Sequence, residues 1–293
     1  MLELRASSAD NDGSLLRERL DADGYLLMRG LVDVQLVDQL GAATFSILRD
    51  QDLLDRGDDA IAKFRATRTT YYSAVQRVEA FHALAHDEGL RRVVRALLGD
   101  DAFVHPRKLL RALWPDVPEL TTTPHQDLQY IGGTPNTVTT WLPLRACLAG
   151  KGALRVLTGS HGQGLVKNVP SPGFAGSRAD VDDDDPRWAS ADFRPGDVLL
   201  FGSTTVHGAT PNTSERVRLS ADYRHQSASE PIAAAELKPA GYPGVPDWPE
   251  LLDDVIWPYD RWLSVPPDLE IVDAASDAPR IPPATGRFAK SRD

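Results

Sequence analysis

Two short segments, far apart in the sequence, carry side chains that can bind a transition metal. His125-Gln126-Asp127 lies in TTTPHQDLQY, and His207 follows the apolar run DVLLFGSTTV. If the first segment is a strand, His125 and Asp127 point to the same face, because side chains alternate along a strand. Two imidazoles and one carboxylate, with other positions open, form the facial triad of non-heme Fe(II) oxygenases. The pattern therefore predicts an iron site of His125, Asp127 and His207.

The pair His125-x-Asp127 is weak evidence by itself, since one His-x-Asp match is expected by chance in a chain of this length. The residues around His207 strengthen the prediction of a metal site. His207 follows a strand-like run and precedes the turn-forming residues GATPN. Arg218 then lies eleven residues after His207, on the strand that this turn is predicted to start. The joint pattern supports a metal site more strongly than either motif.

The segment RVRLSADY is predicted to be a strand with one apolar and one polar face. The two faces are Val217, Leu219, Ala221 and Tyr223 against Arg216, Arg218, Ser220 and Asp222. An arginine grips a carboxylate through two hydrogen bonds, and a serine hydroxyl two positions along adds a donor. We expect Arg218, helped by Ser220, to bind a dicarboxylate. The alternative is a pair between Arg218 and an acidic neighbour on an exposed sheet, and Arg216 is the less favoured candidate.

Several segments together resemble one family. They are Asp23-Gly24-Tyr25, Pro124-His125-Gln126-Asp127, the strand Val138 to Leu144 with Trp141, Lys151-Gly152-Ala153-Leu154, Gly159-Ser160-His161, Arg194-Pro195-Gly196-Asp197, His207-Gly208, Asn212 and Arg218. Over residues 20–228 the chain resembles the phytanoyl-CoA dioxygenase family of Fe(II)/2-oxoglutarate-dependent oxygenases. One departure is Lys151, where the family usually has Asn in a turn.

The resemblance implies a mainly β fold with flanking helices: a double-stranded β-helix (jelly-roll, cupin-like) core braced by N-terminal helices. It implies Fe(II) as the metal, 2-oxoglutarate as co-substrate and O₂ as oxidant. Arg218 and Ser220 would then hold the far carboxylate of 2-oxoglutarate, and Trp141 would line the same pocket. Asp127 argues against a halogenase, in which that ligand position is vacated for chloride.

The sequence indicates the substrate-binding residues less clearly than the metal ligands. Gln126, Gln129 and Tyr130 are the candidates to contact the substrate. The expected reaction is hydroxylation of an unactivated C–H bond in a small molecule, preferably a natural-product or secondary-metabolite intermediate, with release of succinate and CO₂. Desaturation, cyclisation or epoxidation with the same cofactors is the first alternative. A redox-inactive, metal-binding cupin-like hydrolase or isomerase is the second, and Arg218 with Ser220 argues against it.

Composition limits the partners. The 293 residues are 42% hydrophobic and 25% charged, which is typical of a soluble globular protein. The net charge of −10 argues against nucleic acid and against an anionic membrane surface. A single cysteine, Cys147, excludes an internal disulfide, and neither a signal-peptide core nor a membrane-length apolar run is evident. We therefore expect a cytoplasmic enzyme with a small-molecule substrate.

Residues 1–293 are predicted to form a single oxygenase domain. Its helical part covers about residues 1–100, its jelly-roll core about 101–230 and its tail about 231–293, with the last residues disordered. Apolar spacing predicts helices at 15–20, 32–48 and 88–98, with an early strand in DGYLLMRGL. From about residue 101, short apolar runs separated by Pro, Gly, Asn and Asp favour an antiparallel sandwich or barrel.

The sequence also predicts the behaviour of one long loop and of the C-terminal tail. Residues 166–193 are long and irregular, and we expect a mobile lid over the pocket. The tail is rich in aromatic side chains that are predicted to pack back on the domain: Trp248, Trp257, Tyr259 and Trp262.

The remaining histidines and one basic cluster are interpreted as structural. His82 and His86 have the spacing of zinc-protease ligands but lack the glutamate that follows the first histidine. His161 is not expected to bind metal, and His105 and His225 have no evident partner. The cluster is Arg107, Lys108 and Arg111, which we interpret as a solvated strand edge, with anionic-substrate binding as the alternative.

Overall fold

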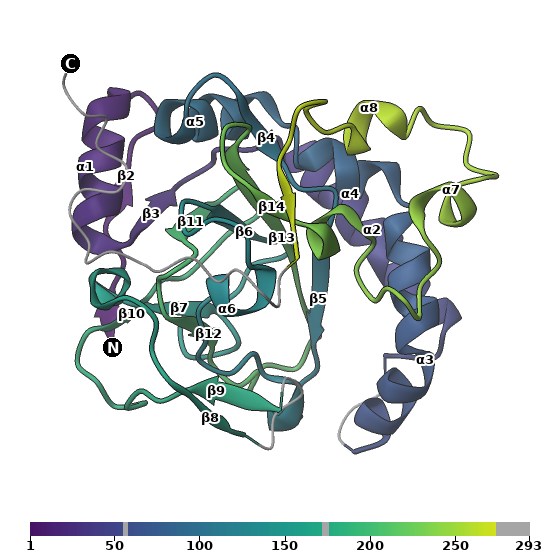
Figure 1. The fold of residues 1–293 in the computed structure, drawn as a ribbon. Helices are drawn as coiled ribbons and strands as arrows, with labels where there is room; N and C mark the ends of the chain where they lie inside the picture. Colours follow the sequence, from purple (N-terminus) through teal and green to yellow (C-terminus); the bar gives the residue numbers. More distant parts are fainter. Residues whose placement is uncertain (55–57, 172–175, 274–293) are drawn as a thin grey trace.

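Two β-sheets lie at the centre of the molecule, and helices pack on the outer face of the larger sheet (Figure 1). The computed structural model describes residues 1–54, 58–171 and 176–273, with the side chains of 58–61 left out. The residues predicted to be disordered at the end of the tail, 277–293, lie outside these described residues.

The larger sheet has seven strands in the order β2-β3-β11-β6-β13-β4, with β5 also paired to β13. Their bounds are β2 Ala6–Ser7, β3 Tyr25–Met28, β4 Ala102–Val104, β5 Leu109–Leu113, β6 Val138–Pro143, β11 Val198–Gly202 and β13 Arg218–Ser227. The pairs are antiparallel except β2 with β3.

The smaller sheet has four strands in the order β1-β10-β7-β12. They are β1 Leu2–Glu3, β7 Leu154–Leu157, β10 Trp188–Ser190 and β12 His207–Ala209. Two short pairs stand apart: β8 Asn168–Pro170 with β9 Ser177–Ala179, and β14 Ile232–Ala233 with β15 Ile271–Val272. The sheets are mixed and open rather than closed into a barrel, and the expected mainly β, cupin-like core with flanking helices is confirmed.

Five helices precede the core: α1 Gly13–Asp23, α2 Val34–Asp50, α3 Asp58–Gln76, α4 Glu79–Leu84 and α5 Glu88–Leu98. Shorter ones follow: η1 Pro118–Leu120, α6 Leu128–Ile131, η2 Ser160–Gln163, η3 Ala234–Leu237, α7 Trp248–Leu251 and α8 Asp260–Leu263. None of the helices in the described parts of the chain is long and apolar enough to cross a membrane. The helices predicted at 15–20, 32–48 and 88–98 correspond to α1, α2 and α5, whereas α3 and α4 lie within the predicted helical part without predicted bounds of their own.

Alternation along the strands of the larger sheet separates two apolar layers. Leu26 and Met28 of β3, like Leu200 of β11, contact the helices in the main core. Tyr25 and Leu27 face the other way and pack with side chains of the smaller sheet, such as those of β7. The space between the two sheets is therefore lined by every second residue of each central strand.

The turn between α1 and β3 explains the Asp-Gly-Tyr motif. Gly24 ends the helix in the left-handed region at φ 82°, where glycine is favoured. A Cβ on Gly24 would also lie 2.5 Å from Nδ1 of His161, so a side chain does not fit there. His161 in turn binds the carbonyl of Asp21 through Nε2 at 2.8 Å. His161 thus holds this turn in place.

The described parts of the segment 166–193, which are 166–171 and 176–193, are more regular than predicted, since they contain β8, β9 and β10. The β8–β9 pair lies next to the first metal-binding motif: the amide of Ala179 donates to the carbonyl of Pro124 at 2.7 Å, and Thr123 Oγ1 donates to Ser177 O at 3.2 Å. Mobility of this segment stays a prediction. The predicted packing of the aromatic tail is confirmed, because Trp248, Trp257 and Tyr259 contact the main core.

The helix layer and the larger sheet should depend on each other for stability. Leu200 is fully buried between them, so Leu200→Ala should lower the free energy of unfolding by about 2–5 kcal/mol. Leu148, which is 47% exposed, provides the control: Leu148→Ala should change stability by less than about 0.5 kcal/mol. Urea denaturation followed by circular dichroism measures both, and equal effects would contradict this packing.

Candidate metal centre and co-substrate pocket

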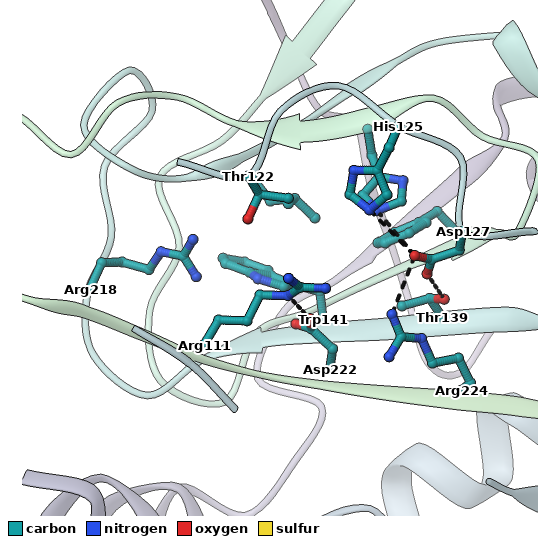
Figure 2. A pocket seen from close by; sticks show the side chains of 12 residues that line it. Arg111, Thr122, His125, Asp127, Thr139, Trp141, Arg218, Asp222 and Arg224 are labelled. Carbon is teal, nitrogen blue, oxygen red and sulfur yellow. Dashed lines mark hydrogen bonds and ion pairs between the residues drawn. The ribbon is translucent and has the colours of Figure 1, made fainter. Parts of the chain in front are cut away.

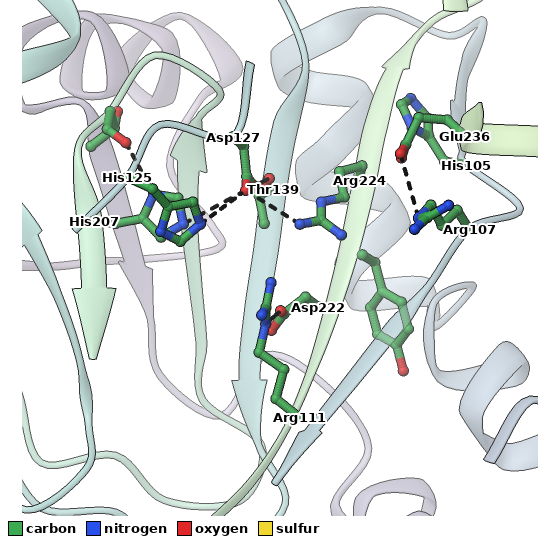
Figure 3. Close-up of polar contacts among 12 residues, drawn as sticks. His105, Arg107, Arg111, His125, Asp127, Thr139, His207, Asp222, Arg224 and Glu236 are labelled. Atoms are coloured by element: carbon green, nitrogen blue, oxygen red, sulfur yellow. Dashed lines mark hydrogen bonds and ion pairs between the residues drawn. The ribbon is translucent and has the colours of Figure 1, made fainter. Parts of the chain in front are cut away.

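The side chains of His125, Asp127 and His207 converge between the two sheets (Figure 3). Nε2 of His125 lies 3.5 Å from Oδ1 of Asp127, and Nε2 of His207 lies 3.8 Å from the same oxygen. All three residues are buried, and their three candidate ligand atoms lie within 4.8 Å of one another. This spacing allows one ion to contact two imidazoles and one carboxylate.

Strand pairing positions the two histidines, whereas a turn positions the aspartate. His125 and His207 form an antiparallel bridge, with reciprocal amide-to-carbonyl bonds of 2.8 and 2.9 Å. Asp127 has helical backbone angles, φ −58° and ψ −37°, and precedes α6. The prediction that His125 and Asp127 share one face of a strand is therefore wrong, because the chain turns into a helix between them.

Backbone carbonyls fix the orientation of both imidazole rings. Nδ1 of His125 donates to Thr123 O at 2.8 Å, and Nδ1 of His207 donates to Thr205 O at 3.0 Å. A carbonyl only accepts, so Nδ1 carries the proton and Nε2 presents its lone pair to the centre. Burial, with the nearby His125, lowers the pKa of His207 to about 3 and keeps this ring neutral. Both rings thus have the form that binds a metal.

Asp127 is held as a carboxylate. Its Oδ2 accepts a hydrogen bond from Thr139 Oγ1 at 2.6 Å, and its Oδ1 lies 3.3 Å from a terminal nitrogen of Arg224. Burial favours the protonated acid, but the charge of Arg224 outweighs it and keeps the pKa of Asp127 well below its usual value. The donor set fits Fe(II), which binds neutral imidazole and carboxylate.

A buried arginine lies at the far end of the same pocket from the carboxylate of Asp127 (Figure 2). Arg218 donates to Ser220 Oγ, and its guanidinium carbon lies 5.7 Å from the ring centre of Trp141. In the described ranges no carboxylate forms an ion pair with Arg218. Its Nε and the Nε1 of Trp141 are buried without a partner. Burial lowers the pKa of Arg218 to about 10.

This environment favours an anionic ligand over an internal ion pair. A buried guanidinium without a counter-ion is costly, and a carboxylate bound beside it removes that cost. The acidic neighbour considered as an alternative for Arg218 is not found among the described residues. Arg216 is exposed and precedes β13, so it does not reach this pocket.

The three candidate substrate residues lie in different places. Gln126 is fully buried, and its amide bonds to Gly164 O and Thr204 O at 2.7 and 2.6 Å and to the amide of Val166 at 2.7 Å. These bonds occupy Gln126 in holding the loop that follows η2.

Gln129 likewise donates to Val166 O at 2.6 Å. Tyr130 is 45% exposed and lines an outer cleft of about 300 Å³ that also contains His125 and Asp127. Of the three candidates, the structure brings only Tyr130 to this cleft.

The sequence interpretation assigned no role in the site to Thr139, Asp222 and Arg224, and it named Arg111 only in a basic cluster with anionic-substrate binding as the alternative. Asp222 and Arg224 continue the polar face that begins at Arg218, so the alternation itself carried the signal. Arg111 pairs with Asp222 and lines the pocket. The interpretation of Arg107, Lys108 and Arg111 as a solvated strand edge is wrong, since Lys108 is fully buried and both arginines line the outer cleft.

The other histidines have structural partners. His82 Nε2 contacts Gln76 O at 2.7 Å, and His86 Nε2 contacts Trp262 O at 3.3 Å. His105 and His225, for which the sequence suggested no partner, also have one. His105 contacts Glu236 at 3.2 Å and Gln226 at 2.8 Å, and His225 lies 3.1 Å from Thr140 Oγ1.

The fold and the facial triad together define a non-heme iron enzyme of the cupin-like oxygenase class. The model of the phytanoyl-CoA dioxygenase family matches residues 20–220, and the chain belongs to this family. It is therefore a dioxygenase that uses Fe(II), 2-oxoglutarate and O₂.

Two related proteins from Streptomyces are described as 1-deoxypentalenic acid 11-beta-hydroxylases. The protein of Streptomyces exfoliatus is 28% identical over 263 residues, covering 83% of this chain and 89% of the relative. That of Streptomyces arenae is 28% identical over 265 residues with the same coverage.

Solved structures with this fold include the non-heme monooxygenase ThoJ in its apo form, with a TM-score of 0.59 and 19% identity over 74% of this chain and 79% of that one. Another is the 2-oxoglutarate-dependent carbocyclase SnoK from nogalamycin biosynthesis, with a TM-score of 0.53 and 19% identity over 78% of this chain and 89% of that one. At this identity the likeness supports a shared fold.

The hydrogen bond from Thr139 to Asp127 should affect metal affinity. Thr139→Val removes the donor that orients the carboxylate, and the affinity for Fe(II) should fall about 10- to 100-fold. Thr140→Val is the matched control, because Thr140 points to the other face of β6 and contacts His225. Anaerobic Fe(II) titration measures both variants. An equal loss of Fe(II) affinity in Thr139→Val and Thr140→Val would contradict the role of Thr139.

Proposed function

We propose that this dioxygenase hydroxylates a C–H bond of a small natural-product intermediate and releases succinate and CO₂. The observation that carries the proposal is the buried Arg218, which has no carboxylate partner among the described residues and shares one pocket with His125, Asp127 and His207. A 2-oxoglutarate molecule has one carboxylate for each end of such a pocket.

Each group of residues then has a physical task. His125, Asp127 and His207 would hold Fe(II), which with 2-oxoglutarate and O₂ supplies the oxidising power for C–H hydroxylation. Arg218 and Ser220 would bind the far carboxylate of 2-oxoglutarate. Trp141, whose Nε1 is a buried donor without a partner, would cover that end of the pocket.

The outer cleft is the place for the substrate. It contains His125, Asp127 and Tyr130 but not Arg218, which lines the inner pocket and a separate groove beside Cys147 and Arg216. A substrate in the cleft would thus approach the metal without displacing the co-substrate. The ring of Tyr130 stands edge-on to His125, with ring centres 5.6 Å apart, and would form one wall beside the metal.

Hydroxylation is preferred to the other outcomes because both Streptomyces relatives are described as hydroxylases of a small acid. Desaturation, cyclisation and epoxidation use the same cofactors, so product analysis by mass spectrometry decides among them. One added oxygen atom per succinate released supports hydroxylation, whereas loss of two hydrogens supports desaturation or ring closure. A redox-inactive hydrolase or isomerase would have no use for the buried Arg218.

Removal of Arg218 should weaken 2-oxoglutarate binding and leave iron binding intact. For Arg218→Ala we expect a Kd for 2-oxoglutarate at least about 30-fold higher, since a buried charge pair loses one partner. Arg216→Ala is the matched control, because Arg216 is exposed two positions earlier. Anaerobic titration of the Fe(II)-loaded proteins measures the Kd. An unchanged Kd in Arg218→Ala would exclude this arginine as the co-substrate ligand.

A further inference from the structure

Positive charge is in excess around the pocket and the outer cleft, although the whole chain carries a net charge of −10. Apart from Arg68, which has contacts of its own, four arginines line these two spaces against three carboxylates: Arg107, Arg111, Arg218 and Arg224 against Asp127, Asp222 and Glu236. The two charges of Fe(II) and those of the 2-oxoglutarate dianion cancel. The loaded site therefore retains a surplus of positive side chains, which favours an anionic substrate.

Two of the cleft arginines are already committed to carboxylates. Arg224 contacts Asp127 at 3.3 Å. Arg107 Nε lies 3.7 Å from Glu236, and its terminal nitrogen donates to Ala235 O at 3.3 Å. These contacts hold both guanidinium groups against protein carboxylates, and the side chain of Arg224 is only 4% exposed.

Arg111 is differently placed. It lies on β5 opposite Ser220, and it contacts Asp222 through Nε alone. Neither terminal nitrogen of Arg111 has a hydrogen-bond partner in the described part of the chain. Its side chain is 29% exposed. Arg111 and Arg224 are the two arginines that line both the inner pocket and the outer cleft.

The orientation of Arg111 suits a ligand that also reaches the metal. In Figure 2 its side chain extends into the space between Arg218 and Asp127, and in Figure 3 it points toward the two histidines with Asp222 beside it. A bound anion would thus meet the two free nitrogens of a guanidinium whose position is fixed by an ion pair. Such a fork binds a carboxylate in a defined orientation.

The rest of the cleft is apolar enough to take a hydrocarbon body. Its walls include Tyr72, Leu109, Leu120, Tyr130 and Ile131. A volume of about 300 Å³ suits a compact small molecule. Apolar walls beside the terminal nitrogens of Arg111 suit a ligand with a hydrocarbon body and an anionic group.

We propose that the substrate is an apolar carboxylic acid and that the terminal nitrogens of Arg111 bind its carboxylate. This inference rests on the proposed function, because it assumes that the outer cleft is the substrate site. It adds a specificity-determining residue: Arg111 fixes one end of the substrate, so that a C–H bond at a set distance from the acid group faces the metal. Neutral analogues of the same shape would lose this anchor.

The test measures binding without turnover. Protein loaded anaerobically with Fe(II) and 2-oxoglutarate is titrated by calorimetry with three probes, cyclohexane-, adamantane- and cyclododecanecarboxylate, and with the methyl ester and primary alcohol of each. At least one acid should bind about tenfold or more tightly than its ester and alcohol, since a charge-assisted hydrogen bond is lost in the neutral forms. If no acid binds more tightly than its ester, the proposal is overturned.

Variants then locate the anchor. Arg111→Gln should remove the preference for the acid, and Arg111→Gln with Asp222→Asn should do the same without leaving a buried carboxylate unpaired. Arg107→Gln is the matched control within the cleft, and Arg49→Gln, on the exposed end of α2, is the control outside it. Both controls should keep the preference. An equal loss in Arg107→Gln would overturn the assignment to Arg111.

Two further outcomes separate this inference from neighbouring possibilities. If Arg111→Gln weakens the binding of 2-oxoglutarate and not that of the acid probe, Arg111 belongs to the co-substrate site. The inference then fails while the proposed function stands. If the wild-type protein binds Fe(II) but not 2-oxoglutarate, the proposed function itself fails. Tighter binding of dodecanoyl-CoA than of every free acid would overturn the choice of a carboxylate as the anionic group.

Discussion

Burial of charge on the inner face of β13 is the constraint on which the site depends. Arg218, Asp222 and Arg224 project from this strand into the space between the sheets, where a charged group is stable only with a partner. Arg224 has Asp127 and Asp222 has Arg111. Of these three residues, only Arg218 has no oppositely charged partner among the described residues. One strand would thus support the metal ligand Asp127, the proposed substrate anchor Arg111 and the proposed co-substrate end of the pocket.

The outer face of the same strand connects this charge arrangement to the helices. Leu219, Ala221 and Tyr223 are fully buried in the main core. The hydroxyl of Tyr223 donates to Phe81 O of α4 at 2.9 Å. The helix layer therefore fixes the position of β13, and through β13 the spacing between Arg218 and the metal ligands. A mixed, open pair of sheets can hold a site of this kind because its central strands are packed on both faces.

The sequence predicted those parts of the site that depend on strand alternation or on distinctive residue types. Arg218 and Ser220 follow from the polar face of one strand, and the two histidines from their strand-and-turn surroundings. Asp127 is aimed by a helical turn, which the pattern His-x-Asp does not reveal. The role of Gln126 was missed because its three hydrogen bonds go to backbone groups of distant loops. Such partners are set by tertiary packing.

If one pocket holds Fe(II) and 2-oxoglutarate together, the visible absorption of the wild-type protein should show both components bound at the same site. The apoprotein is titrated anaerobically with Fe(II), first alone and then with 2-oxoglutarate, while visible absorption is recorded. We expect a weak charge-transfer band that requires both components, since a keto acid then chelates ferrous iron beside the triad. Bound iron without such a band at saturating 2-oxoglutarate would show that the two do not share this pocket.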